Sequence, residues 1–236
     1  METFLAALII FIGSFVQSSI GFGLAIVAAP FLFLLSPDYV PAPITLVALV
    51  LSVANAYRYR SNISLKGLGA AIVGRIPGTV AGGALLLWVD AKSLSLWLGL
   101  SVLIAVAVSL LPLRIAPTTP RMLFAGFLSG FMGTSTAIGG PPLALLLQHE
   151  QANLIRANLS AFFIISCILS LLVQGYTGYM TWHHLTLTLP LIPAMLLGYW
   201  LATLYVERIA NHHIRVASLC ICSLSGIGAI ALYWMS

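Results

Sequence analysis

Residues 125–149, AGFLSGFMGTSTAIGGPPLALLLQH, are apolar at both ends and unsuited to one continuous helix in the middle. The centre combines small hydroxyl residues, glycines and a double proline: Gly133, Thr134, Ser135, Thr136, Gly139, Gly140, Pro141 and Pro142. Proline lacks an N–H and clashes with the preceding turn, glycine is conformationally loose, and proline suits a first helical position. The stretch therefore predicts a helix, a polar glycine-rich tip, and a second helix from about Pro141.

The composition is typical of an integral membrane protein. Of 236 residues, 61% are hydrophobic and only 6% are charged, and the mean hydropathy is +1.08, whereas soluble domains carry about 25% charged residues. Since a spanning helix needs about 20 apolar residues, we expect a single all-α, multi-pass membrane domain over residues 1–236. The basic residues are scattered through the sequence, so no nucleic-acid partner is expected.

The second half of the chain repeats the pattern of the first. Residues 15–23 (FVQSSIGFG) resemble residues 132–140 (MGTSTAIGG), and the pair Pro77 and Gly82 recurs as Pro193 and Gly198. Three apolar segments follow the first motif, at about 43–57, 67–88 and 93–112. Three more follow the second motif, at about 158–174, 184–205 and 216–235. Agreement at two distant places favours duplication over chance similarity. We predict two repeats, 1–117 and 118–236, each with a broken helical hairpin and three spanning helices.

The distribution of Lys and Arg indicates how the broken segments lie in the membrane, because cytoplasmic loops are enriched in these residues. If the segments cross the bilayer, the loops on the two sides carry five and four basic residues. If they are re-entrant hairpins, one side of the membrane carries only Lys92 and the other side carries eight basic residues: Arg58, Arg60, Lys66, Arg114, Arg121, Arg156, Arg208 and Arg215. The arms of the first broken segment, 4–16 and 20–35, also read as shorter than a span. We therefore expect inverted repeats with re-entrant hairpins whose tips meet near mid-membrane, and both termini outside.

The two tips predict an anion site. Inverted repeats with interrupted helices place transporter sites near the bilayer midplane, and helices beginning near Gly21 and Pro141 would direct free N–H groups there. The candidate substrate-binding residues of the tips are Gln17, Ser18, Ser19, Gly21, Gly23, Thr134, Ser135, Thr136, Gly139 and Gly140. The alternative is that the hydroxyl groups cap helices and the glycines permit close packing.

Arg75 is the only basic residue well inside an apolar segment, and an intramembrane charge is a functional candidate. It would bind the anion, or its side chain would snorkel to the cytoplasmic interface. Polar residues also recur on helix faces: Asn158, Ser166, Ser170 and Gln174 at fourfold spacing, and Thr45, Ser52 and Asn55 in the first repeat. They would line a path, with Asn158 as a further candidate for substrate binding, or form hydrogen bonds between helices.

The acidic residues set the expected energetics. All five lie in loops or at segment ends, so no carboxylate is left mid-membrane to carry a coupling proton. Anion export needs none, because each negative charge leaving a negative interior gains about 2.3 kcal/mol per 100 mV. Without clustered acids or spaced histidines, neither an enzyme nor a metal or other cofactor is expected. The expected partners are a small anion and the lipid bilayer, and the sequence is compatible with a homo-oligomer.

The motifs at the two breaks match a known pattern. The first is Gln17 to Gly23 (QSSIGFG) leading to Pro30, and the second runs from Gly130 to Pro142 and ends in IGGPP. Together they resemble the paired motifs of TauE/SafE sulfite-exporter (TSUP) permeases. The resemblance implies a multi-pass transporter of the bacterial inner membrane that exports sulfite, a sulfonate or a related organosulfur anion. An uptake permease, or a channel-like pathway for another small carboxylate or inorganic anion, is the alternative.

Overall fold

The structure, a computed structural model, describes residues 1–64, 67–110 and 115–205, together with a few positions between 220 and 234. Over these residues the chain forms helices and short 3-10 turns, with no strand. The elements are α1 Glu2–Ile20, α2 Leu24–Leu35, η1 Pro37–Tyr39, α3 Ala42–Arg58, η2 Arg60–Asn62, α4 Leu68–Trp88, α5 Ala91–Leu110, α6 Thr119–Thr136, α7 Pro141–Leu147, α8 Ala152–Tyr176, α9 Trp182–Thr188 and α10 Leu191–Tyr205. The all-α prediction is confirmed.

Several of these helices meet the requirements for crossing a bilayer. Within the described ranges, five are long and apolar enough: α1, α3 with the preceding turn, α4, α5 and α8. The pair α9 and α10, bent by 43°, makes a sixth if it is counted as one span. Large apolar side chains such as Leu87, Phe124 and Trp200 face outward, as a lipid-facing surface requires. The multi-pass prediction is confirmed, whereas most of the apolar segment 216–235 lies outside the described residues.

The first arm is longer than the sequence suggested. The prediction that this arm ends near Val16 and is too short to span the membrane is wrong, because α1 is 19 residues long and ends at Ile20. The polar residues at its end are compatible with a helix, since the Ser19 hydroxyl donates to the carbonyl of Phe15 one turn earlier. Likewise, α6 continues to Thr136, where the hydroxyls of Ser135 and Thr136 donate back to helix carbonyls.

Both predicted helix breaks are present, and each is only a few residues long. The first spans 21–23, with Gly21 at φ 99° and Gly23 at φ 121°, and the second spans 137–140, with Ala137 at φ 65°. At each break the chain folds back on itself, because Gly13 lies beside Leu24 and Gly133 lies beside Gly139. The second helix of the later pair begins at Pro141, as predicted.

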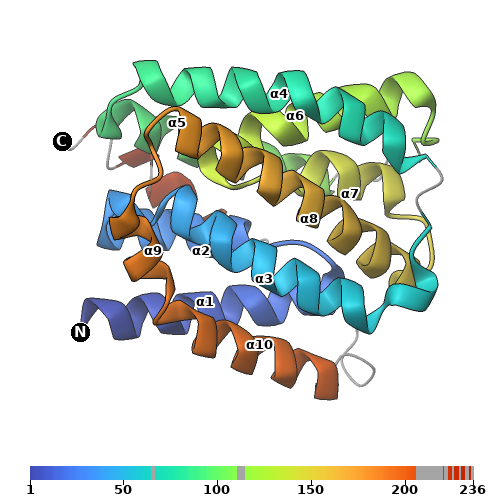
Figure 1. Ribbon diagram of the computed structural model, residues 1–236, viewed down its shortest axis with the longest axis horizontal. Helices are drawn as coiled ribbons and strands as arrows, with labels where there is room; N and C mark the ends of the chain where they lie inside the picture. The colour runs from blue at the N-terminus through green and yellow to red at the C-terminus, as the bar shows by residue number, and fades with distance from the viewer. Residues whose placement is uncertain are drawn as a thin grey trace.

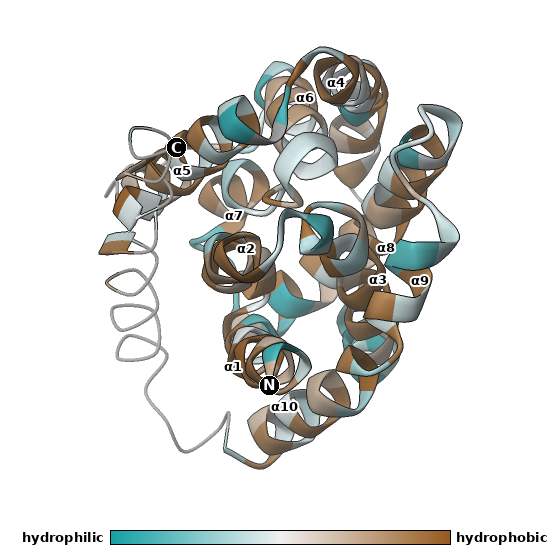
Figure 2. Cartoon of the chain, turned by 90° about the vertical axis from the view of Figure 1, so that its left-hand side faces the viewer, coloured by the Kyte–Doolittle hydropathy of each residue, from teal (hydrophilic) through white to brown (hydrophobic). Residues whose placement is uncertain are grey.

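Helices from opposite halves of the chain pack closely through glycines. Along the α4–α6 contact, Gly74, Gly78 and Gly82 lie against the backbone of Leu123, Phe127 and Phe131 in that order, so the two helices are parallel. In the same way, Gly198 of α10 lies against the backbone of Phe11 in α1. Viewed end-on, the α4–α6 pair and the α1–α10 pair form opposite edges of the bundle, with α2 and α7 between them (Figure 2). This arrangement brings the two breaks into the interior.

Candidate functional site

A cavity of about 40 Å³, lined mostly by buried residues, lies between the two breaks. Its lining includes Gln17 and Gly23 from the first break region, and Gly139 and Gly140 from the second. Spanning helices supply further polar residues: Thr45 from α3, Arg75 from α4, and Ser166 and Ser170 from α8. Since a single water needs roughly 10–15 Å³ of such volume, the cavity accommodates about three waters or one small ion.

Arg75 is the central charge of this cavity. Its side chain is only 3% exposed, and its guanidinium donates from Nη1 to the Ser129 hydroxyl at 2.8 Å and from Nη2 to the Ser170 hydroxyl at 3.0 Å. Nη2 also donates to the carbonyl of Ser166 at 3.2 Å. These partners come from α6 and α8, so the guanidinium is directed into the bundle rather than along α4 toward the membrane interface.

The charge of Arg75 is not neutralised by a carboxylate within the described part of the chain. Its Nε and the hydroxyl of Ser166 are buried without a hydrogen-bond partner, and both residues line the cavity. The guanidinium carbon also lies 5.5 Å from the centre of the Phe162 ring, at the distance of a cation–π contact. An unpaired buried cation and unpaired buried donors are costly, so this cavity favours an anion that accepts hydrogen bonds.

The two helix N-termini differ in the backbone donors that they offer. At the start of α2, the N–H of Leu24 donates to Oε1 of Gln17, and Ala25 and Ile26 line the cavity. The expectation that the helix beginning near Pro141 directs free N–H groups at the centre stays a prediction. Pro141 and Pro142 have no N–H, and α7 is only seven residues long.

The other predicted residues lie beside the cavity or away from it. Ser18 accepts a hydrogen bond from Asn55, the backbone carbonyl of Ser19 accepts from Arg156, and Gly21 lies beside Arg156. Thr134 bonds to Ser170, Ser135 accepts from Trp97, and Thr136 caps its own turn. Asn158 accepts from the backbone N–H of Ser64 at 2.8 Å, away from the cavity. These groups hold helices and loops together in this structure.

Thr45, Ser129, Ser166 and Ser170 contribute to the site but were not among the candidate ligands. Ser166 and Ser170 belong to the polar face seen in the sequence at fourfold spacing, which was a usable signal. Ser129 stands alone in an apolar stretch, and it both accepts from Arg75 and donates to the carbonyl of Gly139. It thereby connects the charge to the second break.

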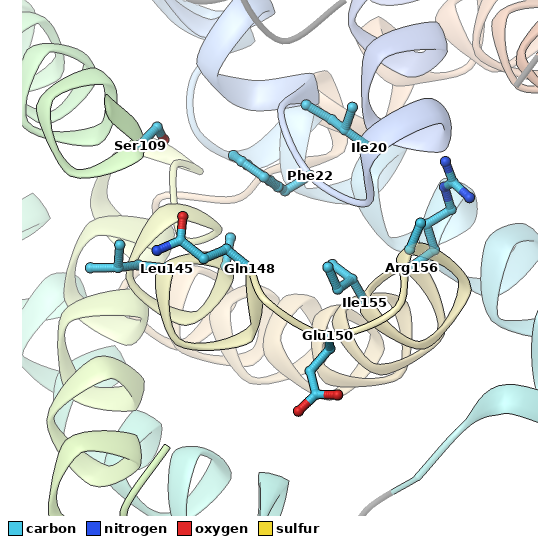
Figure 3. Close-up of a pocket in the computed structure, with 10 residues that line it drawn as sticks. Ile20, Phe22, Ser109, Leu145, Gln148, Glu150, Ile155 and Arg156 are labelled. Atoms are coloured by element: carbon cyan, nitrogen blue, oxygen red, sulfur yellow. The ribbon is translucent and has the colours of Figure 1, made fainter. Parts of the chain in front are cut away.

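A larger, open pocket of about 330 Å³, which we call the vestibule, lies on the other side of the first break. Its lining includes Phe22 from that break, Gln148 after α7, and Ile155 and Arg156 at the start of α8. Figure 3 shows Phe22 projecting from the loop of the first break over this space, with Gln148 facing it. The vestibule therefore leads from one end of the bundle toward the cavity.

Comparison with known proteins identifies the family. The family model for the sulfite exporter TauE/SafE matches residues 5–229. The chain belongs to the TauE/SafE family. The resemblance seen at the two breaks is thus confirmed over nearly the whole chain, and membership of a transporter family agrees with the apolar helices. No curated protein and no solved structure matched the chain.

Proposed function

We propose that this TauE/SafE member exports sulfite, or a similarly small organosulfur anion, through the cavity at Arg75. The observation that carries the proposal is the buried guanidinium, which has no carboxylate partner among the described residues, beside unpaired donors in a cavity of about 40 Å³. Sulfite presents three oxygen acceptors and a negative charge to these donors. A sulfonate with a longer organic part requires the cavity to widen toward the vestibule.

The proposed architecture is a pair of inverted repeats, 1–117 and 118–236, whose broken helices enter the membrane as re-entrant hairpins. The fold-back at each break supports it, as does the exchange of contacts between halves, α4 with α6 and α1 with α10. The breaks also lie close together, because a Cβ added to Gly140 would lie 3.1 Å from Cβ of Phe22. Contact between hairpin tips from opposite faces is the arrangement expected around a midplane site.

We propose that the protein lies in the inner membrane of a bacterial cell, with the vestibule facing the cytoplasm. In Figure 1, α3 ends and α4, α6 and α8 begin at one end of the bundle, and that end carries Arg58, Arg60, Arg121 and Arg156. Lys92, at the start of α5, lies at the other end. Positive charge is enriched in cytoplasmic loops. Lys66, Arg114, Arg208 and Arg215 lie outside the described residues.

Export follows from charge alone in this proposal. An anion leaving a negative interior gains about 2.3 kcal/mol per charge per 100 mV, so no coupling carboxylate is needed. Gating by the protein then controls a movement that the membrane potential already favours.

The test is anion flux from proteoliposomes under an imposed voltage. Vesicles are loaded in turn with sulfite, methanesulfonate, a longer sulfonate and acetate, and efflux is compared at inside-negative and inside-positive potentials. We expect sulfite to leave fastest and inside-negative potential to accelerate it. If no anion leaves faster than from protein-free vesicles, the proposal fails; a preference for acetate over sulfite would contradict the substrate class.

A further inference from the structure

The vestibule and the cavity are separated by a thin wall. Phe22 lines the vestibule, whereas Gly140 and Phe163 line the cavity. A Cβ built on Gly140 would lie 3.1 Å from Cβ of Phe22, 3.5 Å from its ring atom Cδ2 and 3.3 Å from Cζ of Phe163. The space between Gly140 and these two side chains is thus no larger than about one methyl group, and the Phe22 side chain is on the vestibule side of the wall.

The backbone around Phe22 is built to place a bulky residue at a sharp turn. Gly21 and Gly23 flank it with φ values of 99° and 121°, which residues other than glycine rarely adopt. Phe22 itself belongs to neither α1 nor α2, so no helical hydrogen bond fixes its backbone. Rotation about the side-chain torsions of Phe22 moves its ring without changing either helix.

The facing side of the wall has no side chain to move. Gly140 presents only its backbone to Phe22, and Pro141 follows it directly. Displacement of the Phe22 ring therefore opens the vestibule side of the wall, whereas the Phe163 ring stays beside Gly140 on the cavity side.

We propose that Phe22 is the gate on the vestibule side of the anion cavity. In the structure the gate is closed, with the Phe22 side chain beside Gly140, and its displacement admits a small anion to Arg75. The inference rests on the proposed transport function for its biological role, although the barrier itself is a physical property that can be measured without any flux.

Cys167 provides the reporter for this barrier. It lines the cavity with a free thiol that is only 7% exposed, so a reagent must enter the cavity to reach it. The experiment uses the full chain with Cys220 and Cys222 replaced by alanine, reconstituted in lipid vesicles. The rate at which methyl methanethiosulfonate, a small neutral thiol reagent, modifies Cys167 is followed by mass spectrometry.

The expected result is a rate increase of about tenfold or more for Phe22→Ala, because a buried group that requires opening reacts in proportion to the open population. Phe22→Leu should give a smaller increase, since it keeps part of the ring's volume. The control is Phe4→Ala, which removes a ring that is 73% exposed and should leave the rate unchanged.

Size-exclusion elution like that of the parent shows that each variant is folded. If Phe22→Ala misfolds, the Leu variant carries the test. Reaction of Cys167 at the parent rate in a folded Phe22 variant would overturn the gate. Faster labelling combined with no flux of any anion in the parent protein would instead keep the gate and reject the transport proposal.

Discussion

Gly78→Ala tests the packing that fixes Arg75 in place. Gly78 lies one turn from Arg75 on α4, against the backbone of Phe127 in α6. An added Cβ would overlap the backbone O, C and Cα atoms of Phe127, and backbone atoms cannot rotate away as a side chain would. The two helices must therefore separate, which also lengthens the hydrogen bond from Arg75 to Ser129.

The magnitude follows from three contributions. Overpacking typically costs about 1–3 kcal/mol, and a direct overlap with backbone belongs at the upper end of that range. A weakened hydrogen bond to a charged group adds about 1 kcal/mol. Alanine regains about 0.8–1.0 kcal/mol of helix propensity over glycine. The expected net loss is about 2–3 kcal/mol.

The assay is thermal unfolding in detergent, where a loss of this size lowers the apparent Tm of a chain of this length by about 4–12 °C. The matched control is Gly69→Ala in the same helix, where an added Cβ meets no atom within 4 Å. It should leave the apparent Tm unchanged or slightly raised. A Gly78→Ala protein as stable as the control would refute the close α4–α6 contact.

Two further predictions concern the tips and the topology. Gly140→Leu should abolish anion flux in the proteoliposome assay while the protein still folds, because its side chain would fill the space between Phe22, Phe163 and the cavity. The control is Gly175→Leu, which should retain flux because an added Cβ there meets no described atom within 4 Å. Cysteines placed at Ser61 and Thr118, in a chain without its native cysteines, should react in intact cells only with a membrane-permeant reagent, since both positions lie at the basic end. Labelling of both by an impermeant reagent from outside would reverse the orientation.

The helix breaks could be predicted because their chemistry is local. Glycine and proline act through their own backbone, so the changes of direction near Gly21 and Gly139–Gly140 follow from the sequence. The lengths of the breaks could not be predicted in this way. Ser19, Ser135 and Thr136 suit either a tip or a helix, and in the structure each hydroxyl bonds to the carbonyl one turn earlier.

The composition of the cavity depends on contacts between distant residues. Arg75 is 54 residues from Ser129 and 95 from Ser170 in sequence, and only the packing of three helices brings them together. The sequence therefore identified the charge but left two orientations open. At the start of α7, Pro141 and Pro142 have no N–H, so fewer backbone donors are available there than at the start of α2.

The central claim is that the Arg75 guanidinium binds the transported anion, and concentration-dependent sulfite efflux from proteoliposomes tests it most directly. Arg75→Lys keeps the charge but loses the planar donors that reach Ser129 and Ser170, so its apparent affinity should fall about tenfold or more. Arg75→Gln removes the charge as well and should reduce flux further, whereas Arg60→Gln, an exposed control, should behave as the parent. An Arg75→Lys protein with the parent's affinity and maximal flux would contradict the account.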